Sequence, residues 1–133
     1  MKRFLITFAM ILCVLGSFAQ QNIIWFRTTE FSWKQKNEYG SWTNWSDWEP
    51  SNIKVKFDLV KDQVIIYSPS IQIYTVIHEE ERPQDDSGTQ IKFRVVDQDD
   101  DYGHLRLRQE NNGNSQIYID FSNIKWVYNV RRL

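Results

Sequence analysis

The chain has 133 residues, with 16 basic and 17 acidic side chains and a formal net charge of −1. Hydrophobic residues make up 41% of the chain and aromatic residues 15%, which excludes an intrinsically disordered protein. The near-neutral charge gives no reason to expect a nucleic-acid partner. A single cysteine excludes both a disulfide framework and a cysteine-based zinc site.

The first residues have the pattern of a secretory signal peptide. Residues 1–3 are positively charged at two positions, residues 4–15 form an apolar run, and the small residues Ser17 and Ala19 precede the expected cut. The apolar run is about 12 residues long, whereas a membrane-spanning helix needs about 20. We therefore predict cleavage before Gln20 and no membrane span in the mature protein.

Cleavage divides the chain into a signal peptide at residues 1–19 and a single all-β domain at residues 20–133. It removes Cys13, Lys2 and Arg3, so the mature chain has no cysteine and its formal net charge changes from −1 to −3. A small exported protein without disulfides fits the periplasm or secretion from a bacterial-style cell better than a eukaryotic extracellular module. We predict a periplasmic or secreted protein.

Strict alternation of apolar and polar residues recurs along the mature chain, as in half-buried strands. In chain order, the alternating or short apolar segments are 53–59, 64–67, 71–77, 91–95, 105–108, 117–121 and 126–130. Each apolar stripe is expected to face the core, and one of these stripes consists of Ile71, Ile73, Thr75 and Ile77. Segments 23–33 and 39–48 are rich in aromatic residues and less regular.

Most connections between these segments are short turns. The strongest turn signal is Asn-Gly within residues 111–114, and the longest expected connection is the acidic segment 79–88. Short connections favour an antiparallel meander of about eight to nine short strands, which buries its apolar face as a small β-barrel or as a two-layer sandwich. We predict the barrel because nearly every connection is a hairpin. In outline it resembles the small lipocalin-like barrels.

Tryptophans recur every three residues in the segment 41–48. The run is similar to that of thrombospondin type 1 repeats, but those repeats need cysteines that the mature chain lacks, so the family is not assigned. A spacing of three keeps side chains on one side of a polyproline-II-like segment. We predict that Tyr39, Trp42, Trp45 and Trp48 bind a ligand by stacking on sugar rings; the alternative is that the indoles pack on the end or flank of the barrel.

Alternate aspartates, Asp97, Asp99 and Asp101, precede Gly103. Several carboxylates before a sharp turn suit a hard cation, so these three residues are a weak calcium candidate and the only expected cofactor site. The alternative is a solvated hairpin tip, which Asp and Gly also favour. A second acidic group occupies 79–86, and the two groups would form an acidic mouth if they lay at one end of the barrel.

Basic residues alternate on two strands that we expect to be neighbours: Lys92, Arg94, Arg106 and Arg108. Like charges opposite one another on a sheet are unfavourable. Asp120, Glu110 or an anionic ligand would offset them, so we predict this face to be an anion site or a partner-binding face.

The mature chain contains none of the common catalytic motifs. It lacks a G-x-S-x-G elbow, an H-E-x-x-H zinc motif, and the glycine patterns of the P-loop and Rossmann folds. We therefore expect a non-enzymatic binding module for a glycan or another small molecule. The alternative is an envelope protein-protein interaction module without a small ligand, and a small hydrolase is a third, weaker interpretation.

Overall fold

The structure of the protein is a computed structural model that describes residues 22–81, 84–86, 88–112 and 114–133. The predicted signal peptide at residues 1–19 lies outside the described residues. The described residues form strands, turns and loops, and no helix among them is long and apolar enough to cross a membrane. The strands are β1 (Ile23–Gln35), β2 (Glu49–Pro50), β3 (Lys54–Asp58), β4 (Gln63–Ile66), β5 (Gln72–Glu81), β6 (Gln84–Asp85), β7 (Gly88–Val96), β8 (Tyr102–Glu110), β9 (Ser115–Asp120) and β10 (Ile124–Arg132).

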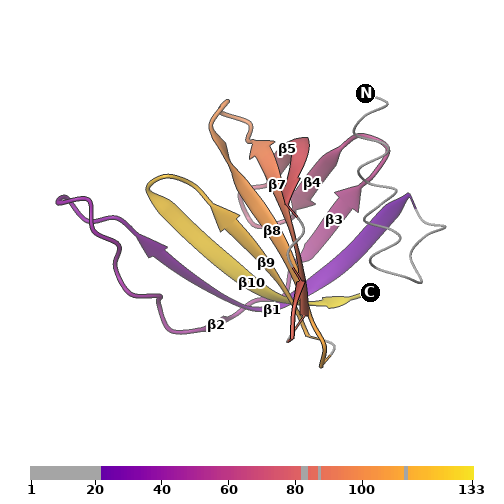
Figure 1. Ribbon diagram of the computed structural model, residues 1–133, viewed down its shortest axis with the longest axis horizontal. Helices are drawn as coiled ribbons and strands as arrows, with labels where there is room; N and C mark the ends of the chain where they lie inside the picture. Colours follow the sequence, from indigo (N-terminus) through magenta and orange to yellow (C-terminus); the bar gives the residue numbers. More distant parts are fainter. Residues whose placement is uncertain (1–21, 82–83, 87, 113) are drawn as a thin grey trace.

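Eight of these strands close into an antiparallel barrel (Figure 1). The order around the barrel is β1, β3, β4, β5, β7, β8, β9 and β10, and β10 pairs again with β1. The two short strands attach to this barrel, since β2 pairs with β1 and β6 pairs with β7. The predicted all-β meander is confirmed, and of the two expected architectures the chain adopts the barrel.

Side chains that alternate inward along every strand fill the interior of the barrel. The stripe Ile91, Phe93 and Val95 on β7 is almost completely buried, as is the stripe Leu105 and Leu107 on β8. The largest fully buried side chains come from all round the barrel: Phe57, Phe93, Ile24, Ile66, Ile91, Leu105, Ile117 and Ile119. The predicted stripes on β3, β7, β8 and β9 therefore face the core.

The predicted stripe on β5 is wrong, because this strand turns its other face inward. Tyr74 and Val76 are 2% and 1% exposed, whereas Ile71 is 49% exposed. Both faces of β5 carry apolar residues, so alternation alone does not select the buried one. The Tyr74 ring has more area to bury than an isoleucine side chain, and its hydroxyl has a hydrogen-bond partner. Ile73 and Thr75 point outward instead, Ile71 is exposed just before the strand, and Ile77 lies at an irregularity in the pairing of β5 with β7.

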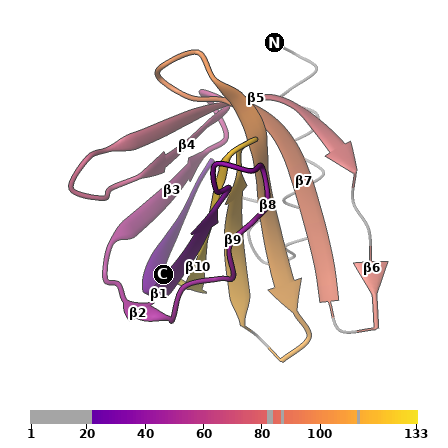
Figure 2. The ribbon, with the colours of Figure 1, turned by 90° about the vertical axis from the view of Figure 1, so that its left-hand side faces the viewer.

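The two acidic segments lie at opposite ends of β7. Segment 79–86 precedes β7, and segment 97–101 connects β7 to β8. Figure 2 shows the β7–β8 connection at the top of the barrel and β6 at the bottom. The expected acidic mouth is therefore wrong, because antiparallel neighbours place successive connections at alternate ends.

Strand β1 is longer than the sequence pattern predicts and extends beyond the barrel with the start of β10 (Figure 1). Its pairing with β10 shifts between Thr28 and Glu30, a β-bulge that bends the strand. The chain then returns along β1, with the Thr43 amide bonded to the Gln35 carbonyl and the Ser46 amide bonded to the Trp33 carbonyl, both at 2.8 Å. The connection 36–53 is consequently longer than 79–88, contrary to the prediction.

Candidate functional site

Three connections meet at one end of the barrel: 67–71, 97–101 and 121–123. The first two flank an open cleft of about 690 Å³, which we call the rim cleft. Binding sites for small molecules commonly have volumes of about 300–1,000 Å³. The rim cleft is lined by Ser68, Pro69, Ser70, Ile71, Gln72, Tyr74, Asp97, Gln98, Asp99 and Trp126.

A second hollow of about 290 Å³ adjoins the rim cleft. The two share Asp97 and Trp126, and the second reaches Tyr102 and the 121–124 segment. The two hollows therefore lie side by side at this end of the barrel, with Asp97 and Trp126 between them.

A polar cluster around Gln72 lies at the inner side of the rim cleft. The Tyr74 hydroxyl donates to Oε1 of Gln72 at 2.6 Å. Nε2 of Gln72 donates to the Tyr128 hydroxyl at 3.1 Å and to the Ser68 hydroxyl at 3.0 Å. One side-chain amide therefore holds three hydroxyl-bearing residues from β5, β10 and the 67–71 connection in fixed positions.

Aromatic rings form the apolar part of the same end of the barrel. Phe121 stacks on Trp126 with a centroid distance of 6.0 Å and contacts Tyr74 at 6.3 Å. Phe31 contacts Tyr128 at 6.3 Å. Rings packed at these distances support one another, so the Trp126 face is held in one orientation.

Both tyrosines of the polar cluster remain protonated. Burial raises the pKa of Tyr74, and Tyr128 and Asp97 raise it further. Burial also raises the pKa of Tyr128, although the hydrogen bond from Gln72 acts in the opposite direction. The cluster is uncharged, and its hydroxyl and amide groups are suited to hydrogen bonding with a polar ligand.

Gln98 connects the two walls of the rim cleft. Its Nε2 donates to the Ile71 carbonyl at 2.7 Å, and its Oε1 accepts from the Ile73 amide at 3.1 Å. These two bonds replace the pairing that a neighbouring strand would provide at the start of β5. They hold the 97–101 connection against the 67–71 connection and so set the width of the cleft.

The predicted calcium residues belong to a tight turn at the mouth of the rim cleft. Oδ1 of Asp97 accepts from the amides of Asp99 at 2.9 Å and Asp101 at 3.0 Å, and Asp100 adopts a left-handed φ of 64°. Asp97 and Asp99 line the rim cleft, and Asp101 lines the adjoining hollow. Across the described parts of the chain, no group of three or more His, Cys, Asp or Glu is arranged to hold a metal ion. The calcium interpretation is not carried forward.

The predicted stacking residues lie elsewhere, on the returning segment outside the barrel. Trp42 and Trp45 face the outer side of the sheet, where Trp45 contacts the Tyr118 ring of β9 edge-on at 6.5 Å. Trp45 and Trp48 are 39% and 45% exposed, and Tyr39 is 85% exposed. The structure therefore separates these four residues from the rim cleft.

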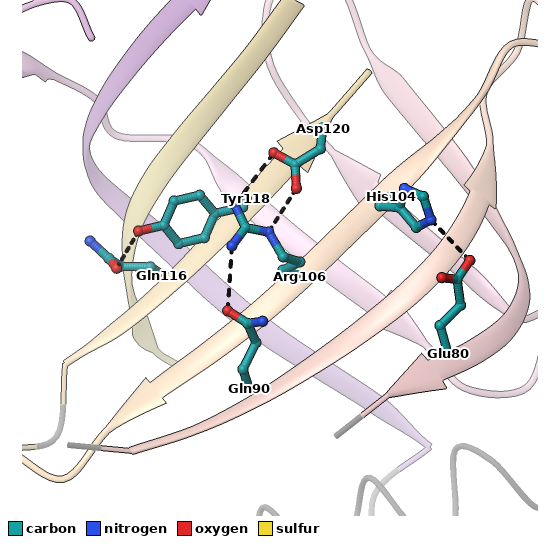
Figure 3. A network of polar contacts seen from close by, with 7 residues as sticks. All are labelled: Glu80, Gln90, His104, Arg106, Gln116, Tyr118 and Asp120. Atoms are coloured by element: carbon teal, nitrogen blue, oxygen red, sulfur yellow. Dashed lines mark hydrogen bonds and ion pairs between the residues drawn. The ribbon is translucent and has the colours of Figure 1, made fainter. Parts of the chain in front are cut away.

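The predicted basic face lies on the outside of β7 and β8, and its arginines have partners (Figure 3). Arg106 bonds Asp120 of β9 at 2.7 Å, lies over the Tyr118 ring at 4.1 Å, and reaches Gln90 at 3.4 Å. Arg108 bonds Glu110 at 3.1 Å. Asp120 and Glu110 are the two acids that the sequence indicated could offset the repulsion between these basic residues.

The other predicted basic residues of this face also have neighbours. Arg94 lies over the Tyr102 ring at 5.3 Å. Burial acts to raise the pKa of Glu80, but the hydrogen bond and charge of His104, with help from Lys92, hold the pKa below its usual value. His104 Nε2 lies 2.9 Å from Oε1 of Glu80 (Figure 3). Arg106 and Arg108 therefore have acidic partners, and Arg94 has an aromatic one.

Comparison of the chain with protein-family models, with curated proteins and with solved structures found no match. Sequence reasoning missed the residues that build the rim cleft and the adjoining hollow: Gln72, Tyr74, Gln98, Phe121 and Trp126. Trp126 was placed on a strand, but only the barrel topology brings it beside Tyr74. The sequence did contain one signal: Gln72 and Tyr74 alternate with isoleucines, which indicates that the inner face of β5 is partly polar.

Proposed function

We propose that the protein is an exported, non-enzymatic β-barrel that binds a glycan in the rim cleft. The observation that carries the proposal is the placing of Trp126 beside the uncharged cluster of Gln72 and Tyr74, in an open cleft of about 690 Å³. A sugar ring has an apolar face that packs on an indole and hydroxyl groups that need donors and acceptors. The rim cleft offers both.

Three further features support a glycan over a purely apolar ligand. The interior of the barrel is filled by its own side chains, so the available site is at the open end. Serine hydroxyls and the Asp97 and Asp99 carboxylates stand around the cleft. Gln98 fixes both walls before a ligand arrives, which lowers the cost of ordering them on binding.

The test is isothermal titration of the protein with neutral malto-, cello- and chito-oligosaccharides, repeated for Tyr74→Phe. This variant keeps the ring but removes the hydroxyl that positions Gln72, so the affinity is expected to fall by about three- to tenfold. Tyr118→Phe removes a hydroxyl bonded to Gln116 on the outer face and is the matched control. Binding by none of the saccharides, or equal losses in both variants, would contradict the proposal.

Docking of an envelope protein is the second candidate function. It is favoured by one observation: Ile73 on the outer face of β5 and Ile71 just before the strand offer apolar surface, and Ile71 is about half exposed. A partner that co-purifies with the wild type and is lost from Ile73→Lys, while saccharide titrations stay flat for both, would favour docking over glycan binding.

A further inference from the structure

Three lysine ammonium groups gather around one indole on the outer face of the barrel. The Nζ atoms of Lys125, Lys36 and Lys34 lie 4.8, 5.4 and 5.6 Å from the centroid of Trp42. Lys34 also lies 4.7 Å from the centroid of Trp45. We call Lys34, Lys36 and Lys125 the lysine patch.

The tryptophans hold these ammonium groups in place. Attraction between an ammonium group and the π-electrons of an indole favours this arrangement. The returning segment is itself fixed, because the Ser32 hydroxyl donates to the Ser46 carbonyl at 2.6 Å and Ser32 is only 1% exposed. Trp42 therefore acts as a support for a charged site, whereas Trp45 contacts Lys34 and keeps an exposed ring surface beside it.

Asp120 of β9 lies opposite Lys125 in register, but its carboxylate is bonded to Arg106 and forms no ion pair with the lysine patch. Lys34 of β1 and Lys125 of β10 are directly opposite in register, an arrangement in which like charges repel. Within the described residues, no carboxylate forms an ion pair with any of the three lysines. Arg106, on the same outer surface, differs in having Asp120 as its partner. An anion that bound between the lysines would relieve their repulsion.

The surroundings limit the size and kind of this anion. The whole chain has a formal net charge of −1, so an extended polyanion such as a nucleic-acid duplex or an anionic membrane would meet repulsion outside the patch. The neighbouring indole of Trp45 is 39% exposed and offers apolar surface beside the charges. A short ligand with an acidic group and an apolar ring face matches both features.

We propose that Lys34, Lys36 and Lys125 bind the sulfate or carboxylate groups of an acidic oligosaccharide. The lysines attract the acidic groups, and the exposed part of Trp45 packs on the adjoining sugar ring. This site is separate from the rim cleft, and it does not depend on neutral saccharides binding there.

The test is a titration of the protein with sulfated dextran oligosaccharides, with unsulfated dextran oligosaccharides of the same length as the control. Tryptophan indole N–H signals in ¹H–¹⁵N spectra report the position. We expect the sulfated probe to shift the signals of Trp42 and Trp45, the unsulfated probe to leave them in place, and added salt to weaken binding. Shifts confined to other tryptophans would overturn the proposal.

Charge-removing variants give the second readout. Lys34→Gln and Lys125→Gln are each expected to weaken binding of the sulfated probe by about two- to fivefold. Lys56→Gln is the matched control, because Lys56 lies 5.6 Å from the Trp25 ring at another position on the barrel. Equal losses in all three variants would show a general charge effect and overturn the site. Equal binding of single-stranded DNA or phosphatidylglycerol vesicles would overturn the ligand class.

Discussion

Replacing Gln98 by methionine tests whether the rim cleft is held open by its walls. Methionine keeps the length and approximate volume of glutamine but removes both bonds, at 2.7 and 3.1 Å, that join Gln98 to the backbone of β5. A neutral hydrogen bond contributes about 0.5–1.5 kcal/mol net, and exposed bonds lie near the lower end. The free energy of unfolding should therefore fall by about 1–2 kcal/mol.

The same variant should bind a rim-cleft saccharide less tightly. If ordering the released 97–101 connection costs about 1 kcal/mol on binding, the affinity falls by roughly fivefold. Urea unfolding followed by tryptophan fluorescence measures the stability, and calorimetry measures the affinity. Gln90→Met is the control, because Gln90 has a bond of only 3.4 Å to Arg106, away from the cleft. Equal unfolding midpoints and equal affinities for Gln98→Met and the control would refute this reasoning.

Three further predictions concern stability. Burial raises the pKa of Asp62, so the charge of this carboxylate destabilises the fold increasingly as pH rises through that pKa. Asp62→Asn, which also suits the φ of 54°, should therefore stabilise the protein at neutral pH, and urea unfolding at a series of pH values should show the gain fading below the ordinary pKa of about 3.9. Asp120→Asn should lower the free energy of unfolding by about 1 kcal/mol, and by less at high salt, because it breaks the partly buried ion pair with Arg106. If the pair contributed nothing, thermal melts of the variant and the wild type at two salt concentrations would show no difference. Gly88→Ala would place a Cβ atom 2.2 Å from the Gln109 carbonyl oxygen and push β7 away from β8, which should lower the free energy of unfolding by about 1–3 kcal/mol. An unchanged melting temperature would contradict that geometry.

The barrel could be predicted because most strands have one clearly apolar face. Ile91, Phe93 and Val95 alternate with charged or polar residues, so their inward direction follows from period two. The pattern was ambiguous at β5, where isoleucines on one face compete with Tyr74 and Val76 on the other. On the buried face, the Tyr74 hydroxyl bonds Gln72 at the rim of the barrel, a contact that the alternation of apolar and polar residues does not contain.

The candidate sites were harder to predict because each assembles residues from distant strands. Trp126 and Gln72 are far apart in the chain and meet only when β10 closes the barrel against β1. The lysine patch depends on the register that places Lys34 opposite Lys125. Periodicity predicts strands, but the bulge between Thr28 and Glu30, which sets that register, has no distinct sequence signature.

The central claim is that a glycan binds in the rim cleft, and the indole N–H spectrum tests it most directly. The protein has 6 tryptophans, and Trp126 is the one that lines the rim cleft, so each signal can be assigned from single Trp→Phe variants. During titration with the tightest-binding neutral oligosaccharide, the account predicts a saturable shift of the Trp126 signal, while the Trp42 and Trp25 signals stay in place. A saturable shift of the other tryptophans with Trp126 unchanged would contradict it.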